Sequence, residues 1–353
     1  MVKYISSSDL GDTVLPKFPY KPTDTEFPSG FIQPDVPLTI LVVVDTEEEF
    51  DWHGQFNPSS VSVKNIVEQP LAQNVFDQYG VSPTYVIDYP VANDTDAVTV
   101  LRTFYDAGRC HIGAHLHPWV TPPQADYLES RYSYPGNLPE FLERQKIKVL
   151  TEKIAAAFGR SPTVYKAGRY GIGPSTSRIL QEFGYQIDAS VVPYTDFSAD
   201  GGPDFGQMSN QIRRFGSSLV EMPLSVDFAG LCAPLGPKLY PLLASKAGRS
   251  LHLPGIAARL GLLERLRLTP EGHTSDDMIR QLQAGIKSGR RLFMLTYHSS
   301  SLLPGATPYV RSESDRQGFL RTIDAFLHTF FRKFGGTANT VDGVARQFLP
   351  AVS

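Results

Sequence analysis

Three histidines lie within the segment CHIGAHLHPWV, residues 110–120, although the chain of 353 residues contains only 8 in total. His115 and His117 are separated by a single residue. Residues i and i+2 of a β-strand point to the same face, so a strand here would direct both imidazoles toward one point. His111 and His115 have the spacing of a helical pair, but the short segment and its Gly113 favour a strand.

An acidic segment, DTEEE (45–49), directly follows the apolar run LTILVVV (38–44). By the same alternation, Asp45 and Glu47 share one face of the predicted strand. Two imidazoles and one carboxylate form a three-ligand site for Zn²⁺, or for Co²⁺ or Ni²⁺, and leave positions for water and substrate. Glu47 is the expected carboxylate ligand, with Glu48 as an alternative.

Further polar residues follow other predicted strands: Lys166 and Arg169, then Asp188, then His298. A bound metal can polarise a carbonyl and make water acidic enough to attack it. A carboxylate that does not bind the metal could then act as a general base. A histidine across the site could protonate the leaving group. The combination predicts hydrolytic chemistry.

Apolar patterns with strand and helix periods alternate along the chain, which predicts an α/β fold with a parallel sheet, either open or closed into a barrel. In such folds the functional side chains lie at the carboxyl ends of the strands. The expected strands are 38–45, 82–88, 111–117, 162–168, 186–192 and 291–299, and the expected helices are 63–80, 94–109, 138–160, 173–185, 274–290 and 313–336.

Three regions are expected from composition. Residues 1–36 are rich in Pro, Ser, Thr and Asp and predict an N-terminal extension. Residues 37–353 are expected to form the catalytic barrel. Within it, the Gly- and Pro-rich stretch 195–270 predicts an insert that is either a wall of the substrate cleft or a surface excursion.

The overall charge is slightly acidic, with a net charge of −3 and a pI of about 6.2. This argues against a nucleic-acid partner, because such proteins usually have a pI above about 9. The first residues lack the apolar region of a secretory signal, and no run approaches the ~18 apolar residues of a membrane span. We therefore expect a cytoplasmic protein; the oligomeric state is not indicated.

Five segments together carry a family resemblance: TILVVVDTEEEFDW, IGAHLHPW, YKAGRYGIG, GYQIDASVVP and FMLTYHSSSLLPGATPY. They resemble the motifs of polysaccharide deacetylases with a NodB-homology domain (carbohydrate esterase family 4), closest to the WalW-like branch. The likeness runs from about residue 38 to 335. It implies a distorted (β/α) barrel of about seven parallel strands that removes N-acetyl groups from amino sugars with a divalent metal.

The resemblance assigns roles to the metal-site segments. Asp45 matches the family's catalytic base, Glu47 its metal-binding acid and His115 its first histidine. The second histidine normally comes four residues later, where this chain has Trp119. His117 is the nearby substitute.

The resemblance also places residues around the acyl group. Lys166 occupies the position of an arginine that orients the base, with Arg169 as the alternative. Lysine cannot form the planar bidentate pair that arginine makes. A backbone N–H near Tyr170 would complete the oxyanion site.

Four other residues receive roles in the same way. Asp188 is expected to orient His298, which matches the family's general acid. Trp119 and Leu295 are expected either to form walls around the acyl group or to belong to the core.

We therefore predict a metal-dependent hydrolase that removes an N-acyl group from an amino sugar, oligosaccharide or glycoconjugate precursor. One alternative is a deformylase or a ureide or cyclic-amide hydrolase on the same scaffold, which could work without metal. Another is a non-catalytic carbohydrate-binding protein.

Overall fold

The computed structural model describes residues 21–22, 31–32, 37–52, 54, 56–124, 130–215 and 218–349. Most of the predicted N-terminal extension, 1–36, lies outside the described residues. Its described part includes the short strand β1 (Phe31–Ile32), which pairs antiparallel with β7 (Ile212–Phe215) at one edge of the main sheet.

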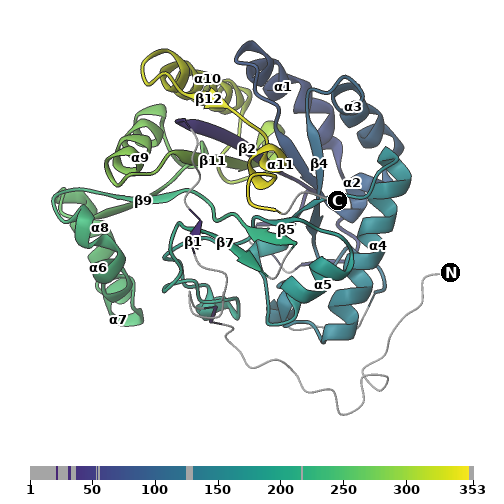
Figure 1. The fold of residues 1–353 in the computed structure, drawn as a ribbon, viewed down its shortest axis with the longest axis horizontal. Helices are drawn as coiled ribbons and strands as arrows, with labels where there is room; N and C mark the ends of the chain where they lie inside the picture. Colours follow the sequence, from purple (N-terminus) through teal and green to yellow (C-terminus); the bar gives the residue numbers. More distant parts are fainter. Residues whose placement is uncertain are drawn as a thin grey trace.

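Seven strands of the main sheet are linked by six successive parallel pairings, in the order β8-β6-β5-β4-β3-β2-β11. This curled, mixed α/β arrangement, in which helices cover the sheet (Figure 1), confirms the predicted distorted barrel. The strands are β2 (Thr39–Thr46), β3 (Thr84–Ile87), β4 (His111–Leu116), β5 (Val164–Ala167), β6 (Ile187–Asp188), β8 (Leu219–Glu221) and β11 (Leu292–His298). The short strand β12 (Thr337–Ala338) also pairs with β2.

The centre of the sheet is apolar on both faces. All eight residues of β2 are buried, as expected for a continuous β-branched run in a parallel strand covered on both sides. β11 lies beside β2 with His298 opposite Asp45. The register therefore brings the polar ends of these two strands to the same edge of the sheet.

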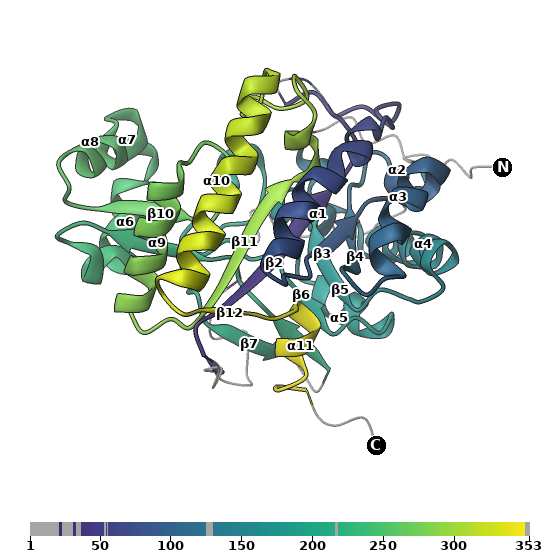
Figure 2. The ribbon, with the colours of Figure 1, turned by 90° about the horizontal axis from the view of Figure 1, so that it is seen from above.

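Helices connect the parallel strands, and Figure 2 shows α1 and α10 lying side by side over β2 and β11. The expected helix 63–80 is divided into a 3₁₀ segment, Lys64–Glu68, and the helix α1, because Pro70 lies in the first turn of α1, where its missing N–H is tolerated. The helices are α1 (Gln69–Gln78), α2 (Tyr89–Asn93), α3 (Thr95–Tyr105), α4 (Glu140–Phe158), α5 (Thr176–Glu182), α9 (Ser275–Lys287), α10 (Glu313–Arg332) and α11 (Val341–Ala345).

The stretch 195–270 contains a second, two-stranded sheet. Its strands β9 (Val226–Ala229) and β10 (Glu264–Arg267) pair antiparallel. Three short helices lie between them: α6 (Gly236–Leu243), α7 (Lys246–Ser250) and α8 (Leu253–Arg259). In Figures 1 and 2 these helices stand at the side of the molecule, outside the main sheet.

Candidate active site

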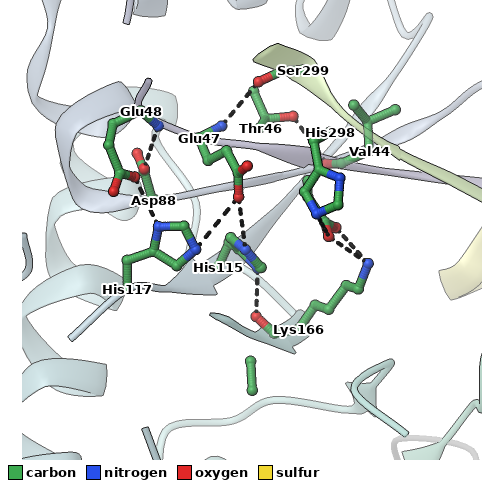
Figure 3. Close-up of polar contacts among 12 residues, drawn as sticks. Val44, Thr46, Glu47, Glu48, Asp88, His115, His117, Lys166, His298 and Ser299 are labelled. Atoms are coloured by element: carbon green, nitrogen blue, oxygen red, sulfur yellow. Dashed lines mark hydrogen bonds and ion pairs between the residues drawn. The ribbon is translucent and has the colours of Figure 1, made fainter. Parts of the chain in front are cut away.

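The three predicted metal ligands converge at the carboxyl ends of β2 and β4. Glu47 Oε2 lies 3.3 Å from His115 Nε2 and 3.4 Å from His117 Nε2. Figure 3 shows the Glu47 carboxylate pointing between the two imidazoles. All three side chains are buried, and their ligand atoms lie close enough together to hold one metal ion. β4 ends at Leu116, and the extended spacing continues through His117, so both rings are aimed at one point.

The outer nitrogen of each ring is held by an acceptor. His115 Nδ1 donates to the carbonyl oxygen of Lys166, at 2.9 Å. A carbonyl can only accept, so Nδ1 carries the hydrogen, and Nε2 of the neutral ring presents a lone pair to Glu47. Burial lowers the pKa of His115 well below its usual value, which keeps the ring neutral. A neutral His115 thus presents no proton to Glu47.

The neighbouring Glu48 orients the second histidine instead of joining this group. Its Oε2 lies 2.8 Å from His117 Nδ1, and its Oε1 accepts from Trp119 Nε1 at 2.7 Å. Its backbone N–H donates to Asp88 Oδ2. Carboxylates that bond the far nitrogen of a metal-binding histidine fix the ring and raise its basicity. Glu47 is therefore the better candidate ligand, and Glu48 supports His117.

One carboxylate oxygen of Glu47 has no hydrogen-bond donor among the described residues. This atom, Oε1, is buried. Burial, together with the charges of Asp45, Glu48 and other nearby carboxylates, raises the pKa of Glu47 well above its ordinary value. A buried carboxylate beside two imine lone pairs fits a cation, because a cation satisfies all three at once.

The second predicted carboxylate, Asp45, pairs with Lys166. Lys166 Nζ donates to both carboxylate oxygens of Asp45, at 2.6 and 2.7 Å, and to Thr296 Oγ1 at 3.1 Å. Burial opposes the ionisation of Asp45, but nearby positive charge, first that of Lys166, outweighs it and lowers the pKa to about 2. Asp45 is therefore ionised across the physiological range. Of the two predicted candidates, Lys166 is the residue that contacts Asp45.

His298 lies on the other side of Asp45, with its Nε2 3.6 Å from Asp45 Oδ2. Its partner is Glu271, whose Oε2 lies 2.8 Å from His298 Nδ1. Glu271 Oε1 also accepts from the His298 backbone N–H at 3.0 Å and from Ser301 Oγ at 2.6 Å. Burial disfavours the charged ring, but Glu271 outweighs burial, so the pKa of His298 is raised.

The prediction that Asp188 orients His298 is therefore wrong. Asp188 is buried at the end of β6 and accepts from the backbone N–H and the hydroxyl of Ser190. β6 and β11 are separated by four strands in the sheet order, so their carboxyl ends do not adjoin. Glu271, which the sequence did not indicate, follows the short strand β10 and supplies the carboxylate.

Arg169 and Tyr170 line the cavity beside this site. Both have left-handed backbone angles, with φ of 52° and 60°, which is uncommon for residues other than glycine. The Arg169 guanidinium lies 4.1 Å from the Tyr134 ring centroid and donates to Ser133 Oγ. The Tyr170 hydroxyl accepts from Arg267 Nη2 at 2.8 Å. The oxyanion role of the N–H near Tyr170 stays a prediction.

The two proposed wall residues both belong to the interior. Trp119 stacks on His117, with ring centroids 4.2 Å apart, and its indole N–H is committed to Glu48. Leu295 is fully buried in the main hydrophobic core, and strand alternation turns it to the face opposite Thr296 and His298. Neither side chain lines the cavity, so the expectation that they enclose the acyl group is replaced by their alternative, a packing role.

The cavity has a volume of about 570 Å³ and opens over Glu47, both histidines, Asp45 and His298. Its walls are rich in aromatic rings, and the stretch 195–270 contributes Phe197, Asp200 and Arg267 to them. The aromatic lining residues are Phe50, Trp52, Phe56, Tyr134, Tyr170, Phe197 and Tyr309.

Comparisons with known proteins support the fold. Neither a family model nor a curated protein matches the sequence. A solved structure from Mycobacterium smegmatis, of a candidate polysaccharide deacetylase, superposes with a TM-score of 0.52 and 16% identity, covering 92% of this chain and 96% of that one. The Puue allantoinase superposes with a TM-score of 0.50 and 12% identity, covering 88% and 89%. At these identities the likeness establishes a shared barrel fold.

Within the described ranges, none of the helices is both long enough and apolar enough to cross a bilayer.

Proposed function

We propose that this protein is a metal-dependent amide hydrolase of the polysaccharide deacetylase type, acting on an N-acylated amino sugar or glycan precursor. The observation that carries the proposal is the grouping of Glu47, His115 and His117 around one point, directly beside the ionised Asp45. The fold and the five sequence motifs are consistent with it.

The donor set fits a divalent cation. His115 and His117 would bind it through Nε2, and Glu47 through its carboxylate, whose Oε1 accepts no hydrogen bond within the described part of the chain. A cation with these three ligands would supply Lewis acidity, which polarises an acyl carbonyl and lowers the pKa of water. Two nitrogens and one oxygen suit Zn²⁺, Co²⁺ or Ni²⁺, with Zn²⁺ our first choice.

Asp45 is the proposed base. Its bidentate contact with Lys166 fixes the carboxylate, and its pKa of about 2 keeps it ionised. Such a weak base removes a proton only from water that has already been made acidic, which is consistent with a cation at the neighbouring ligands. As the water oxygen bonds to the acyl carbon, one of its protons passes to Asp45.

His298 is the proposed acid. Glu271 accepts from Nδ1 and stabilises the protonated ring, so Nε2 carries a proton on the side that faces Asp45 and the cavity. When the C–N bond breaks, this proton passes to the departing nitrogen, which leaves as an amine. The acyl group is released as a carboxylic acid, which gives its remaining proton to solvent, and no covalent enzyme intermediate is required.

The aromatic lining supports a sugar substrate. The ring centroid of Trp52 lies 5.0 Å from that of His298 and 5.7 Å from that of Tyr309, so aromatic rings lie directly beside the proposed acid. Pyranose rings present C–H faces that pack on aromatic side chains, and their hydroxyls need polar groups such as Arg169 and Arg267. A cavity with both features suits an amino sugar better than a purely apolar amide.

The test is a product assay on a substrate panel. Purified protein, with and without a chelator, is incubated with N-acetylated and N-formylated amino sugars and with a cyclic ureide, and acetate, formate and ring opening are measured. We expect release of acetate that the chelator abolishes and added Zn²⁺ restores. Turnover of the ureide alone would favour the alternative substrate class, and an inert, metal-free protein would favour a binding role.

A further inference from the structure

Exposed hydrophobic side chains are concentrated in one segment of the chain. Within the described residues, ten large hydrophobic side chains are exposed, and seven of them lie between 231 and 262. Scattered exposed leucines are normal, but their concentration in one segment makes that segment a candidate interaction surface. The seven are Leu231, Leu235, Leu242, Leu251, Ile256, Leu260 and Leu262, with exposed fractions between 39% and 82%.

These side chains belong to the helical excursion α6–α8, which connects β9 to β10. The inner side of the excursion is already packed: Phe228, Ala257 and Leu263 form a small core that also contacts Tyr240 and Leu243. None of the seven exposed side chains belongs to this small core. Figures 1 and 2 show the three helices projecting at the side of the barrel.

The same excursion has a charge opposite to that of the whole chain. Lys238, Lys246, Arg249 and Arg259 are exposed, and the sequence has no Asp or Glu from residue 228 to 263. One of these cations, Arg249, lies 3.5 Å from Asp196. The chain as a whole carries a net charge of −3, so the basic charge is a local property of this surface.

We propose that α6–α8 form a docking surface for the headgroup region of an anionic lipid bilayer. Leucine side chains that enter the acyl boundary supply apolar burial, while Lys and Arg place their charges at the lipid phosphates. Neither feature alone anchors a protein firmly, but the two together do. The surface requires no membrane-spanning helix.

A second copy of the chain is the main rival occupant, and charge argues against it. In a two-fold dimer the same patch meets itself, so the basic groups of one copy would face those of the other. Like charges brought together at an interface are unfavourable, whereas anionic headgroups neutralise them. The excursion is connected to the site through β10, which ends at Arg267 in the cavity wall.

The experiment uses the full-length protein and vesicles of phosphatidylglycerol and phosphatidylcholine, with pure phosphatidylcholine as the uncharged comparison. Binding is measured by co-sedimentation at low and at physiological salt. One variant carries L231S, L242S and L260S, and a second carries K238Q, K246Q and R259Q. The matched control, V61S with V67S, removes two exposed hydrophobic residues from another part of the surface.

We expect binding to the anionic vesicles, weakened at least about tenfold by the serine variant and about a hundredfold by the glutamine variant, with the control unchanged. Two independent variants at exposed positions, each checked by thermal melting, separate loss of docking from loss of folding. The proposal is overturned if anionic vesicles are not bound at low salt or if neither variant weakens binding. It is also overturned if the protein dimerises without lipid and the serine variant is a monomer. No readout depends on amide hydrolysis, so this inference and the proposed function can fail separately.

Discussion

Lys166 and Asp45 form a buried, bidentate ion pair at the centre of the site, with Nζ 2.6 and 2.7 Å from the two carboxylate oxygens. Both side chains are almost completely removed from solvent. The pair ties β5 to β2 and holds the proposed base ionised. Because a lysine is here the residue that contacts Asp45, a compact point charge takes the place of the planar fork that an arginine would offer.

Removing the carboxylate charge of Asp45 tests the base. We expect Asp45→Asn to lower kcat by about 10²–10⁴-fold, the usual contribution of a general base, and to leave the metal content unchanged. The measurement is kcat on the best substrate of the panel, with elemental analysis of the same sample. Asp276→Asn, at an exposed position on α9, is the control. Normal turnover by the Asp45→Asn variant would remove Asp45 from the base role.

The ion pair should also matter for folding. In Lys166→Met, Asp45 is left buried without its partner, and the free energy of unfolding should fall by about 3–5 kcal/mol. Lys148→Met, which breaks an exposed pair with Glu152, should cost less than about 0.5 kcal/mol. Urea denaturation of the two variants measures both values. Equal losses would show that the buried pair contributes nothing specific.

The dependence of the rate on pH tests the Glu271–His298 pair. The acid works in its protonated form, which predominates below its pKa, so the rate should fall as the pH rises through a value above the usual 6.5. Asp45 raises this pKa as Glu271 does, whereas burial and Lys166 lower it.

Glu271→Gln removes the largest stabilising charge, so the alkaline midpoint of kcat/KM should move to lower pH. The control is Glu264→Gln, on β10 just before Glu271 in the chain, which should leave the pH profile of kcat/KM unchanged. An alkaline limb at the same pH in the Glu271→Gln variant would show that His298 is not the titrating acid.

Glu48 should act on metal affinity through His117. Glu48→Gln keeps an oxygen near Nδ1 but removes the negative charge, and we expect the affinity for Zn²⁺ to fall about 10–100-fold. Competition with a chromophoric chelator measures this, with the exposed Glu152→Gln as control. Unchanged affinity would mean that the Glu48 contact does not tune the site.

The sequence predicted the parts of the site that lie on strongly patterned strands. Asp45 follows a continuous apolar run and His298 ends a mostly apolar strand, and the parallel register of β2 and β11 places them opposite each other. The HLH segment was predictable for the same reason, because strand alternation is a local property. What could be predicted was therefore which strand ends are polar.

The sequence could not predict which strand ends are neighbours. The family resemblance assigns Asp188 to His298, whereas the sheet order separates β6 from β11. Glu271 was missed because β10 is only four residues long and lies in a stretch without clear periodicity. Trp119 could equally have been a cleft wall or a core residue, and its stacking on His117 and its hydrogen bond to Glu48, away from the cavity lining, decide between them.

The most direct test of the account is metal stoichiometry of the wild-type protein and of Glu47→Gln, each dialysed against buffer containing Zn²⁺ and then against buffer alone. We predict about one equivalent in the wild type, as for a site with three protein ligands, and little in the variant. A wild-type protein that retains no metal, or a Glu47→Gln variant that retains as much as the wild type, would contradict the central claim that Glu47, His115 and His117 share one cation.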